Sequence, residues 1–268
     1  MVAGSTGEAP LLADDELSRL LDAARRTTDA RAHAAPDSRA HVIAGCGAES
    51  TRRTIELCGI AAARGADAVL VRSPYYYQDQ MRPAVLHDHF EAVADASVLP
   101  LIVYSIPRYV TVELAPELIG RLMEHPNVVG VKDSSGDLKT MGAIVEACGD
   151  RGAVLAGAGT LLYPALETGA AGGVISVGLL APAAGVELVR AFEAGRSVEA
   201  GRLQQKIGPL HKAVVGKGGI AGIKAGLDLL GLYGGPVRAP LVPLPGRDRT
   251  NVEDALFQAG VMPARDRQ

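Results

Sequence analysis

The stretch Pro126-Asn-Val-Val-Gly-Val-Lys-Asp-Ser-Ser-Gly-Asp137 contains a short apolar run that ends in a lysine. Val128, Val129 and Val131 are β-branched, which is typical of a strand buried on both faces. Burying an ammonium group without a partner is costly, and a lysine avoids that cost by losing its proton. A neutral lysine in a dry pocket is a nucleophile for carbonyl carbons. This segment alone leaves two readings for Lys132: such a nucleophile, or a residue that leaves the strand and reaches water.

Similar apolar runs recur along the chain and alternate with longer amphipathic segments. The other runs lie at residues 42–44, 68–71, 101–104, 154–156 and 173–175. Helical patterns between them include residues 51–64, which Ser50 can cap, and residues 116–124, with Pro116 in the first turn. The alternation predicts parallel strands joined by right-handed crossovers. Successive strands lie roughly 20 to 30 residues apart, as in a (β/α)8 TIM barrel.

Two segments depart from this alternation. Residues 27–38 are expected to form an irregular surface loop. Beyond Gly195, helical patterns take over at residues 198–215, 220–230 and 252–259. We therefore predict an α/β protein with two parts, a (β/α) barrel at residues 1–195 and a C-terminal helical extension at residues 196–268.

Composition is that of a soluble, cytoplasmic protein. The chain has 268 residues, of which 48% are hydrophobic and 21% charged, so it can bury a substantial core. A net charge of −3 gives no reason to expect nucleic acid or a membrane surface as a partner. The three cysteines lack metal-ligand spacing and are expected to be reduced thiols. No apolar run approaches the roughly 20 residues that span a bilayer, and the first residues lack the pattern of a signal peptide.

Residues with hydroxyl, phenol and amine groups follow several predicted strands, where active sites of parallel barrels lie. They are Gly4-Ser5-Thr6-Gly7-Glu8, Pro74-Tyr75-Tyr76, Tyr104, Lys132, Gly157 and Ile175-Ser176. The set offers no histidine pair or carboxylate cluster for a metal. It suits imine chemistry, in which an amine attacks a ketone, hydroxyls pass protons and backbone N–H groups hold a carboxylate. Taken singly, the glycine-rich loop could be an ordinary turn, and the tyrosines could fill a core or an interface.

Together these motifs resemble the dihydrodipicolinate synthase and N-acetylneuraminate lyase family of class I, lysine-dependent pyruvate aldolases. Gly4-Ser-Thr-Gly-Glu8 matches the family's Gly-Thr-Thr-Gly-Glu loop, Tyr104-Ser-Ile-Pro107 its Tyr-Asn-x-Pro element, and Val131-Lys-Asp-Ser134 its Schiff-base strand. The resemblance runs from Gly4 to about Gly260. Within the family the chain is most similar to the 4-hydroxy-2-oxoglutarate aldolases, which share Gly47-Ala-Glu-Ser-Thr51, the Tyr-Ser-x-Pro element and the stretch from Tyr233 to Pro240.

The resemblance implies catalytic roles for four residues. Lys132 is expected to form an imine with the keto carbon of pyruvate or of a 2-oxo acid. Tyr104 is expected to shuttle protons at that centre. Ser5, where many members have threonine, links Tyr104 to Tyr76 in this scheme. In the family the tyrosine that matches Tyr76 comes from the neighbouring subunit, so the resemblance implies a homo-oligomer, either a dimer or a homotetramer.

The resemblance also implies how substrate is held. Ser5 and Thr6 are expected to bind the 1-carboxylate, Gly157 and Ile175 to line the other side, and Ser134 to contact the far end of the substrate. The partners are small 2-oxo acids and aldehydes. No cofactor is expected beyond the covalent imine on Lys132, and no metal.

Three features depart from the family pattern. Members that make dihydrodipicolinate carry an arginine two residues after the proline of the Tyr-Asn-x-Pro element, for the carboxylate of the second substrate. That position is Tyr109, and the adjacent Arg108 is not counted as a replacement. After Ser176, where relatives often have Thr-Ala-Asn, residues 177–180 read Val-Gly-Leu-Leu, which predicts an apolar wall. The family's first strand and helix precede the glycine-rich loop, so we expect an N-terminally truncated barrel and a longer natural gene product.

The specific expectation is that the chain cleaves 4-hydroxy-2-oxoglutarate to pyruvate and glyoxylate through a Schiff base on Lys132. Alternatives with the same fold are dihydrodipicolinate synthase and another pyruvate lyase or hydratase–aldolase. An alternative from another class is an inactive, truncated barrel that survives as a binding or structural protein. His87 and His89, two residues apart in a helical pattern, are assigned surface or capping roles.

Overall fold

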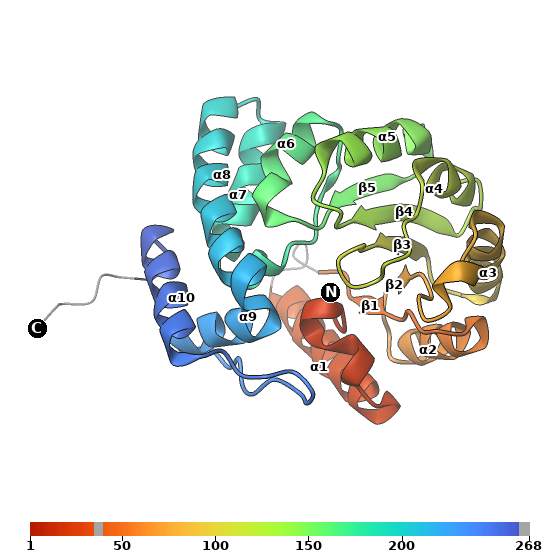
Figure 1. Ribbon diagram of the computed structural model, residues 1–268, viewed down its shortest axis with the longest axis horizontal. Helices are drawn as coiled ribbons and strands as arrows, with labels where there is room; N and C mark the ends of the chain where they lie inside the picture. The colour runs from red at the N-terminus through yellow and green to blue at the C-terminus, as the bar shows by residue number, and fades with distance from the viewer. Residues whose placement is uncertain (35–39, 263–268) are drawn as a thin grey trace, which may run out of the picture. The chain divides into compact units, whose positions relative to one another are not determined.

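The computed structural model describes residues 1–34 and 40–262, and the chain divides into two compact units, Met1–Leu155 and Ala156–Gln268. One sheet contains six strands in the order of the sequence (Figure 1). The strands are β1 (Ile43–Gly45), β2 (Ala68–Arg72), β3 (Leu101–Ser105), β4 (Val128–Asp133), β5 (Ala153–Ala156) and β6 (Gly172–Gly173). The pairs β1–β2, β2–β3 and β3–β4 are parallel, as the alternation predicts. Each strand overlaps one of the apolar runs.

The helices of the first unit follow its strands. They are α1 (Asp14–Ala34), α2 (Thr51–Ala63), α3 (Pro83–Ala96), α4 (Pro116–Leu122) and α5 (Leu138–Cys148). Helices α2 to α5 lie along the outer side of the strands that they connect (Figure 1). Ser50 caps α2 by accepting a hydrogen bond from the Arg53 N–H, and Pro116 stands at the start of α4, both as predicted. These short crossovers bring the carboxyl ends of β2, β3 and β4 together.

The predicted loop over residues 27–38 is wrong for its first part, because α1 continues to Ala34. The Arg25 guanidinium pairs with Asp29 one turn later at 2.9 Å, and the Thr27 hydroxyl donates to the carbonyl of Ala23 at 2.8 Å. The polar residues of this stretch are therefore the exposed side of a helix rather than a loop. Residues 35–38 lie outside the described residues.

The second unit is mainly helical. Its helices are α6 (Leu162–Glu167), α7 (Pro182–Glu193), α8 (Ser197–His211), α9 (Gly218–Leu229) and α10 (Gly246–Gln258), with a π-helical segment at Lys212–Lys217. Beyond Gly195 the part of this unit that the structure describes contains helices and turns but no strand, which agrees with the helical patterns of the sequence. The predicted boundary between a barrel and a helical extension at residue 195 stays a prediction.

The predicted (β/α)8 barrel is confirmed in part. The sheet has six strands in sequence order, with helices between them. Before β1, Val2 forms an isolated parallel bridge with Ala44. The Val2 N–H donates to the carbonyl of Ile43 at 2.8 Å, and the Gly45 N–H donates to the carbonyl of Val2 at 2.9 Å. The first residues thus extend the sheet beside β1 by a single bridge. The expected truncation stays a prediction.

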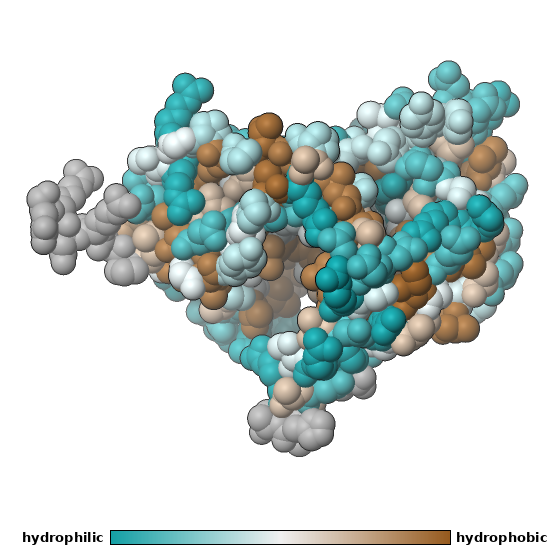
Figure 2. All heavy atoms as spheres, turned by 90° about the horizontal axis from the view of Figure 1, so that it is seen from below, coloured by the Kyte–Doolittle hydropathy of each residue, from teal (hydrophilic) through white to brown (hydrophobic). Residues whose placement is uncertain are grey.

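Hydrophobic residues reach the surface at several places. Figure 2 shows hydrophobic and hydrophilic residues interspersed on one face. Large exposed apolar or aromatic side chains include Tyr76, Tyr77 and Val98 in the first unit and Val198 and Tyr233 in the second. In the described part of the chain, every helix is too short or too polar to cross a membrane.

Candidate active site

Three polar side chains occupy one row across neighbouring strands. Arg72 of β2 pairs in register with Tyr104 of β3, and Tyr104 pairs with Lys132 of β4. Paired residues of adjacent parallel strands point to the same face of the sheet. The row therefore places a guanidinium, a phenol and an amine side by side at the carboxyl ends of the strands, where parallel α/β folds bind their ligands.

Lys132 is buried, with only 5% of its surface exposed. Its Nζ lies 3.3 Å from the Tyr104 hydroxyl oxygen and 4.3 Å from the centre of that ring. Removal from water lowers the pKa of Lys132 from 10.5 to about 8. In about a tenth of the molecules the Lys132 amine is then uncharged at pH 7. The reading in which Lys132 reaches water is wrong, and an amine able to attack a carbonyl is available near neutral pH.

Tyr104 connects Lys132 to the glycine-rich loop. The Ser5 Oγ lies 3.4 Å from the Tyr104 hydroxyl oxygen. Burial raises the pKa of Tyr104, and hydrogen bonds with Ser5 and Ser134 act against this rise. The phenol is therefore protonated at neutral pH and can donate a proton. The Ser134 Oγ is buried and has no partner of ordinary hydrogen-bond geometry among the described residues, although it lies close enough to lower the Tyr104 pKa.

The loop Gly4–Glu8 is a tight turn held against the end of β1. The Gly7 N–H donates to the carbonyl of Gly4 at 2.9 Å, and Thr6 lies half-buried in the same turn. Glu8 is buried with φ at 57°, a left-handed conformation that is rare without glycine. A Cβ on Gly45 would collide with the backbone of Ala3, so glycine at the end of β1 lets the loop approach.

Arg72 and Glu49 were not predicted as site residues from the sequence, although Glu49 lies within the stretch Gly47–Thr51. The Arg72 Nη1 lies 2.9 Å from a carboxylate oxygen of Glu49, and the other oxygen accepts hydrogen bonds from the N–H groups of Tyr75 and Tyr76, both at 2.9 Å. Burial raises the pKa of Glu49, but these two N–H groups and Arg72 together lower it below its ordinary value. A signal was present in the sequence, because Arg72 ends a buried apolar run just as Lys132 does.

The Tyr76 side chain is 73% exposed and packs edge-on against Tyr77, with ring centres 5.1 Å apart. Within the described residues of this single chain it has no hydrogen bond to Ser5. The structure thus brings Ser5, Tyr104 and Lys132 together and leaves the Tyr76 ring on the surface. The link from Ser5 to Tyr76 of a neighbouring subunit stays a prediction.

Gly157 and Ile175 belong to the second unit. Gly157 directly follows β5, Ile175 comes shortly after β6, and both are half-buried. Their predicted place beside the substrate stays a prediction. Val177 and Leu180, which were expected in an apolar wall, are only 1% and 2% exposed. Their side chains fill the core of the second unit, so their apolar character serves packing there.

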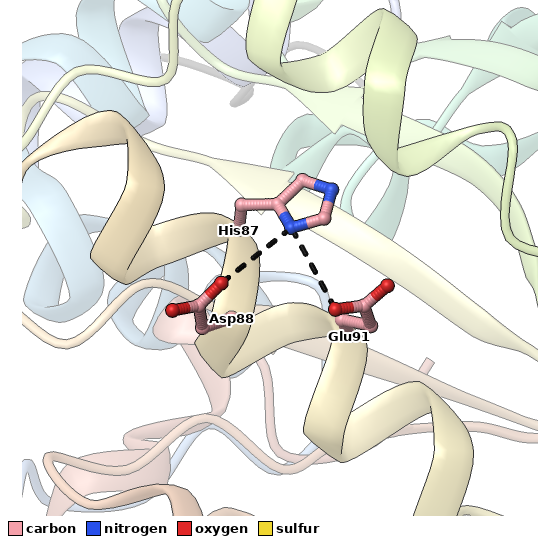
Figure 3. A group of neighbouring side chains, drawn as sticks. All are labelled: His87, Asp88 and Glu91. Atoms are coloured by element: carbon pink, nitrogen blue, oxygen red, sulfur yellow. Dashed lines mark ion pairs between the residues drawn. The ribbon is translucent and has the colours of Figure 1, made fainter.

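A further group of titratable side chains lies on α3, away from the row. The His87 Nδ1 is 3.8 Å from a carboxylate oxygen of Asp88 and of Glu91 (Figure 3). Both acidic residues are exposed, and such groups are common without a metal ion. Of the surface or capping roles predicted for His89, the surface role is wrong: this residue is buried with its Nδ1 2.9 Å from the Thr51 hydroxyl, because residues two apart face different sides of a helix. Burial lowers the pKa of His89 to about 4.

Known proteins share both the sequence and the fold. The model of the dihydrodipicolinate synthetase family matches residues 1–259. This chain belongs to that family. A 4-hydroxy-tetrahydrodipicolinate synthase from Methanothrix thermoacetophila is 35% identical over 94% of the chain and 82% of its own length. One from Thermomicrobium roseum is 37% identical over 94% of the chain and 80% of its own length.

Among solved structures, the chloride-inhibited dihydrodipicolinate synthase of Acinetobacter baumannii in complex with pyruvate matches with a TM-score of 0.89. It is 34% identical over 97% of this chain and 86% of its own. YagE of E. coli K12, a prophage protein of the dihydrodipicolinic acid synthase family in complex with pyruvate, matches with a TM-score of 0.87 at 26% identity, over 97% of this chain and 86% of its own.

Membership of the dihydrodipicolinate synthetase family makes the chain a class I, pyruvate-dependent aldolase, a carbon–carbon lyase. The similar relatives are named for the synthase reaction. The more specific expectation of a 4-hydroxy-2-oxoglutarate aldolase finds no support in these relatives, which favour the alternative drawn from the same family.

Proposed function

We propose that this chain joins pyruvate to an aldehyde through a Schiff base on Lys132, with 4-hydroxy-tetrahydrodipicolinate as its product. The observation that carries the proposal is the buried Lys132 amine, 3.3 Å from the Tyr104 hydroxyl oxygen and with its pKa lowered to about 8. The names of the similar relatives support the choice of product. A pyruvate complex of a structural neighbour supports the choice of the first substrate.

The row of side chains suits the Schiff-base step and the protonation that completes C–C bond formation. The neutral amine of Lys132 adds to the keto carbon of pyruvate, and loss of water leaves an iminium. The iminium draws electrons from the adjacent C–H bond, so removal of that proton gives a neutral enamine. The enamine carbon attacks the aldehyde and forms the new C–C bond. Tyr104, protonated and 3.4 Å from the Ser5 hydroxyl, can supply the proton that the new alkoxide takes up.

The product identifies the aldehyde. 4-Hydroxy-tetrahydrodipicolinate is a seven-carbon dicarboxylic acid with one ring nitrogen. Removing the three carbons of pyruvate leaves a four-carbon amino acid that ends in an aldehyde, aspartate 4-semialdehyde. After the C–C bond forms, its amine attacks the imine carbon, closes the ring and releases Lys132. One water leaves overall, and no oxidant or reductant is needed.

Cleavage of 4-hydroxy-2-oxoglutarate is the second candidate, and one observation favours it. Tyr109 stands where synthase members carry an arginine for the second carboxylate, and it is 47% exposed. The Arg108 guanidinium lies 5.6 Å from the centre of the Tyr109 ring. The tyrosine at this position lacks the positive charge that synthase members use to bind the carboxylate of the second substrate.

Trapping with pyruvate and borohydride tests the proposal. Reduction of the iminium should add pyruvate irreversibly to Lys132, and peptide mass spectrometry should find the adduct there. The protein should then condense pyruvate with aspartate 4-semialdehyde faster than with glyoxylate. An adduct on another lysine, or a folded protein that forms none, overturns the Schiff-base assignment. The latter result would favour the inactive barrel.

We further propose that the active form is a homodimer or homotetramer in which Tyr76 enters the site of a neighbouring subunit. The 73% exposure of this side chain beside the exposed Tyr77 supports such an interface. The cytoplasmic location expected from the sequence also stays a prediction. No metal or organic cofactor takes part in the proposed reaction.

A further inference from the structure

We propose that Arg72 binds the carboxylate of the aldehyde substrate. The inference rests on the proposed function, because it assigns a contact to the second substrate of that reaction. It supplies the cation that Tyr109 does not provide. The chemical class that Arg72 would select is an aldehyde carrying a carboxylate, in preference to a neutral aldehyde of the same length.

Arg72 lies in line with the proposed reaction centre. Arg72, Tyr104 and Lys132 are consecutive members of one row on one face of the sheet. Adjacent strands lie roughly 4.8 Å apart, so two strand spacings, roughly 10 Å, separate the backbones of Arg72 and Lys132. A substrate attached to Lys132 that extends past the Tyr104 hydroxyl therefore points toward Arg72. A short dicarboxylate skeleton is the right length for that span.

A small pocket of about 40 Å³ opens beside the row, and Arg72 forms part of its wall. Ser5 and Tyr104 line the same pocket, together with Gly45 and Gly47. Gly47 leaves room for the long arginine side chain. A Cβ on Gly47 would collide with the Arg72 stem and lie 2.8 Å from the Arg72 backbone nitrogen. Arg72 thus shares a pocket with Ser5 and Tyr104 of the proposed reaction centre.

The hydrogen bonds of Arg72 leave donors for a ligand. Its Nη1 donates to the carbonyl of Ser73 and to the Glu49 carboxylate, both at 2.9 Å. Among the described residues, Nε and Nη2 have no hydrogen-bond acceptor, while the guanidinium stacks 4.9 Å from the centre of the Tyr75 ring. A guanidinium has five N–H donors and binds carboxylates through two parallel bonds. Arg72 is therefore held in place on one side and available on the other.

A change at Glu49 distinguishes substrate binding by Arg72 from a purely structural role of Arg72. It offsets part of the Arg72 charge, and it also holds the backbone of Tyr75 and Tyr76. If Arg72 serves only to hold Glu49 and this turn, removing either partner should harm all substrates alike. If Arg72 binds the substrate carboxylate, removing the Glu49 charge should strengthen that binding, because a competing anion is lost.

The experiment compares aldehydes that differ only in the carboxylate. Wild-type protein, Arg72→Gln, Arg72→Lys and Glu49→Gln are assayed with pyruvate and either succinic semialdehyde or butanal, both four-carbon aldehydes, with aspartate 4-semialdehyde as a third substrate. Charge-assisted hydrogen bonds contribute about 1.5–3 kcal/mol, so Arg72→Gln should lower kcat/KM about 10- to 100-fold for the two carboxylated aldehydes. The kcat/KM of Arg72→Gln with butanal should differ from that of the wild type by less than about threefold. Arg72→Lys should recover part of the preference for carboxylated aldehydes over butanal. Glu49→Gln should increase that preference above the wild-type value.

Pyruvate trapping on Lys132 serves as the control in all four proteins. If wild-type protein is not trapped, the proposed function fails. If trapping is normal, three outcomes overturn the Arg72 assignment alone: equal losses with charged and neutral aldehydes in Arg72→Gln, a lower preference in Glu49→Gln, or no turnover of carboxylated aldehydes by the wild type.

Discussion

Lys132 is chemically distinct from the other lysines of the chain because burial removes water from its amine. The unprotonated form reacts with pyruvate, and the pKa of about 8 means that this form becomes dominant above about pH 8. We expect the rate of reductive trapping to rise about tenfold for each pH unit on the acid side and to level off above about pH 8. A profile that still rises toward pH 10.5 would show that the amine is solvated.

The Tyr104 hydroxyl is the second residue whose role follows from its surroundings. Tyr104→Phe keeps the ring against the Lys132 amine, 4.3 Å from the ring centre in the wild type, and removes only the hydroxyl. A general acid or base contributes about 10²- to 10⁴-fold to the rate. We expect kcat to fall by that factor while the thermal midpoint changes little. Unchanged turnover would exclude Tyr104 from proton transfer.

At the scale of elements, Gly130 determines how closely β4 approaches β5. A Cβ on Gly130 would lie 2.5 Å from the carbonyl oxygen of Ala153, a backbone atom that cannot rotate away. We expect Gly130→Ala to lower the free energy of unfolding by about 1–3 kcal/mol and to slow pyruvate trapping by shifting Lys132. Gly59→Ala in α2 is the matched control: its Cβ meets open space, and helix propensity should raise stability by about 0.5–1 kcal/mol. If denaturant unfolding shows the same change in the free energy of unfolding for Gly130→Ala and Gly59→Ala, the prediction is contradicted.

At the scale of the whole molecule, the proposed site requires two chains. Lys132→Ala and Tyr76→Phe should each form homo-oligomers of low activity. When the two are unfolded, mixed and refolded, a hybrid combines an intact Lys132 with an intact Tyr76 at one shared site, so activity should return. Each variant refolded alone is the control. If the mixture is no more active than the average of its parts, Tyr76 does not act in a neighbouring subunit.

The sequence by itself determined the positions of the strands and the main reactive group. Apolar β-branched runs predicted all six strands to within two residues, because burial on both faces leaves a local signature in composition. The same reasoning identified Lys132, since a cation at the end of such a run is out of place unless it has a function. Ser5 and Tyr104 followed from their places at strand ends.

Tertiary structure decided what depends on register and on packing between distant segments. The row of Arg72, Tyr104 and Lys132 exists because three strands pair in one register, and no local pattern reports that alignment. His89 is buried against Thr51 for a similar reason, since its partner lies in another helix. The contact of Glu49 with Arg72 likewise joins the loop after β1 to the end of β2. Local sequence encodes which residues avoid water, but which of them meet is fixed only when the strands pair.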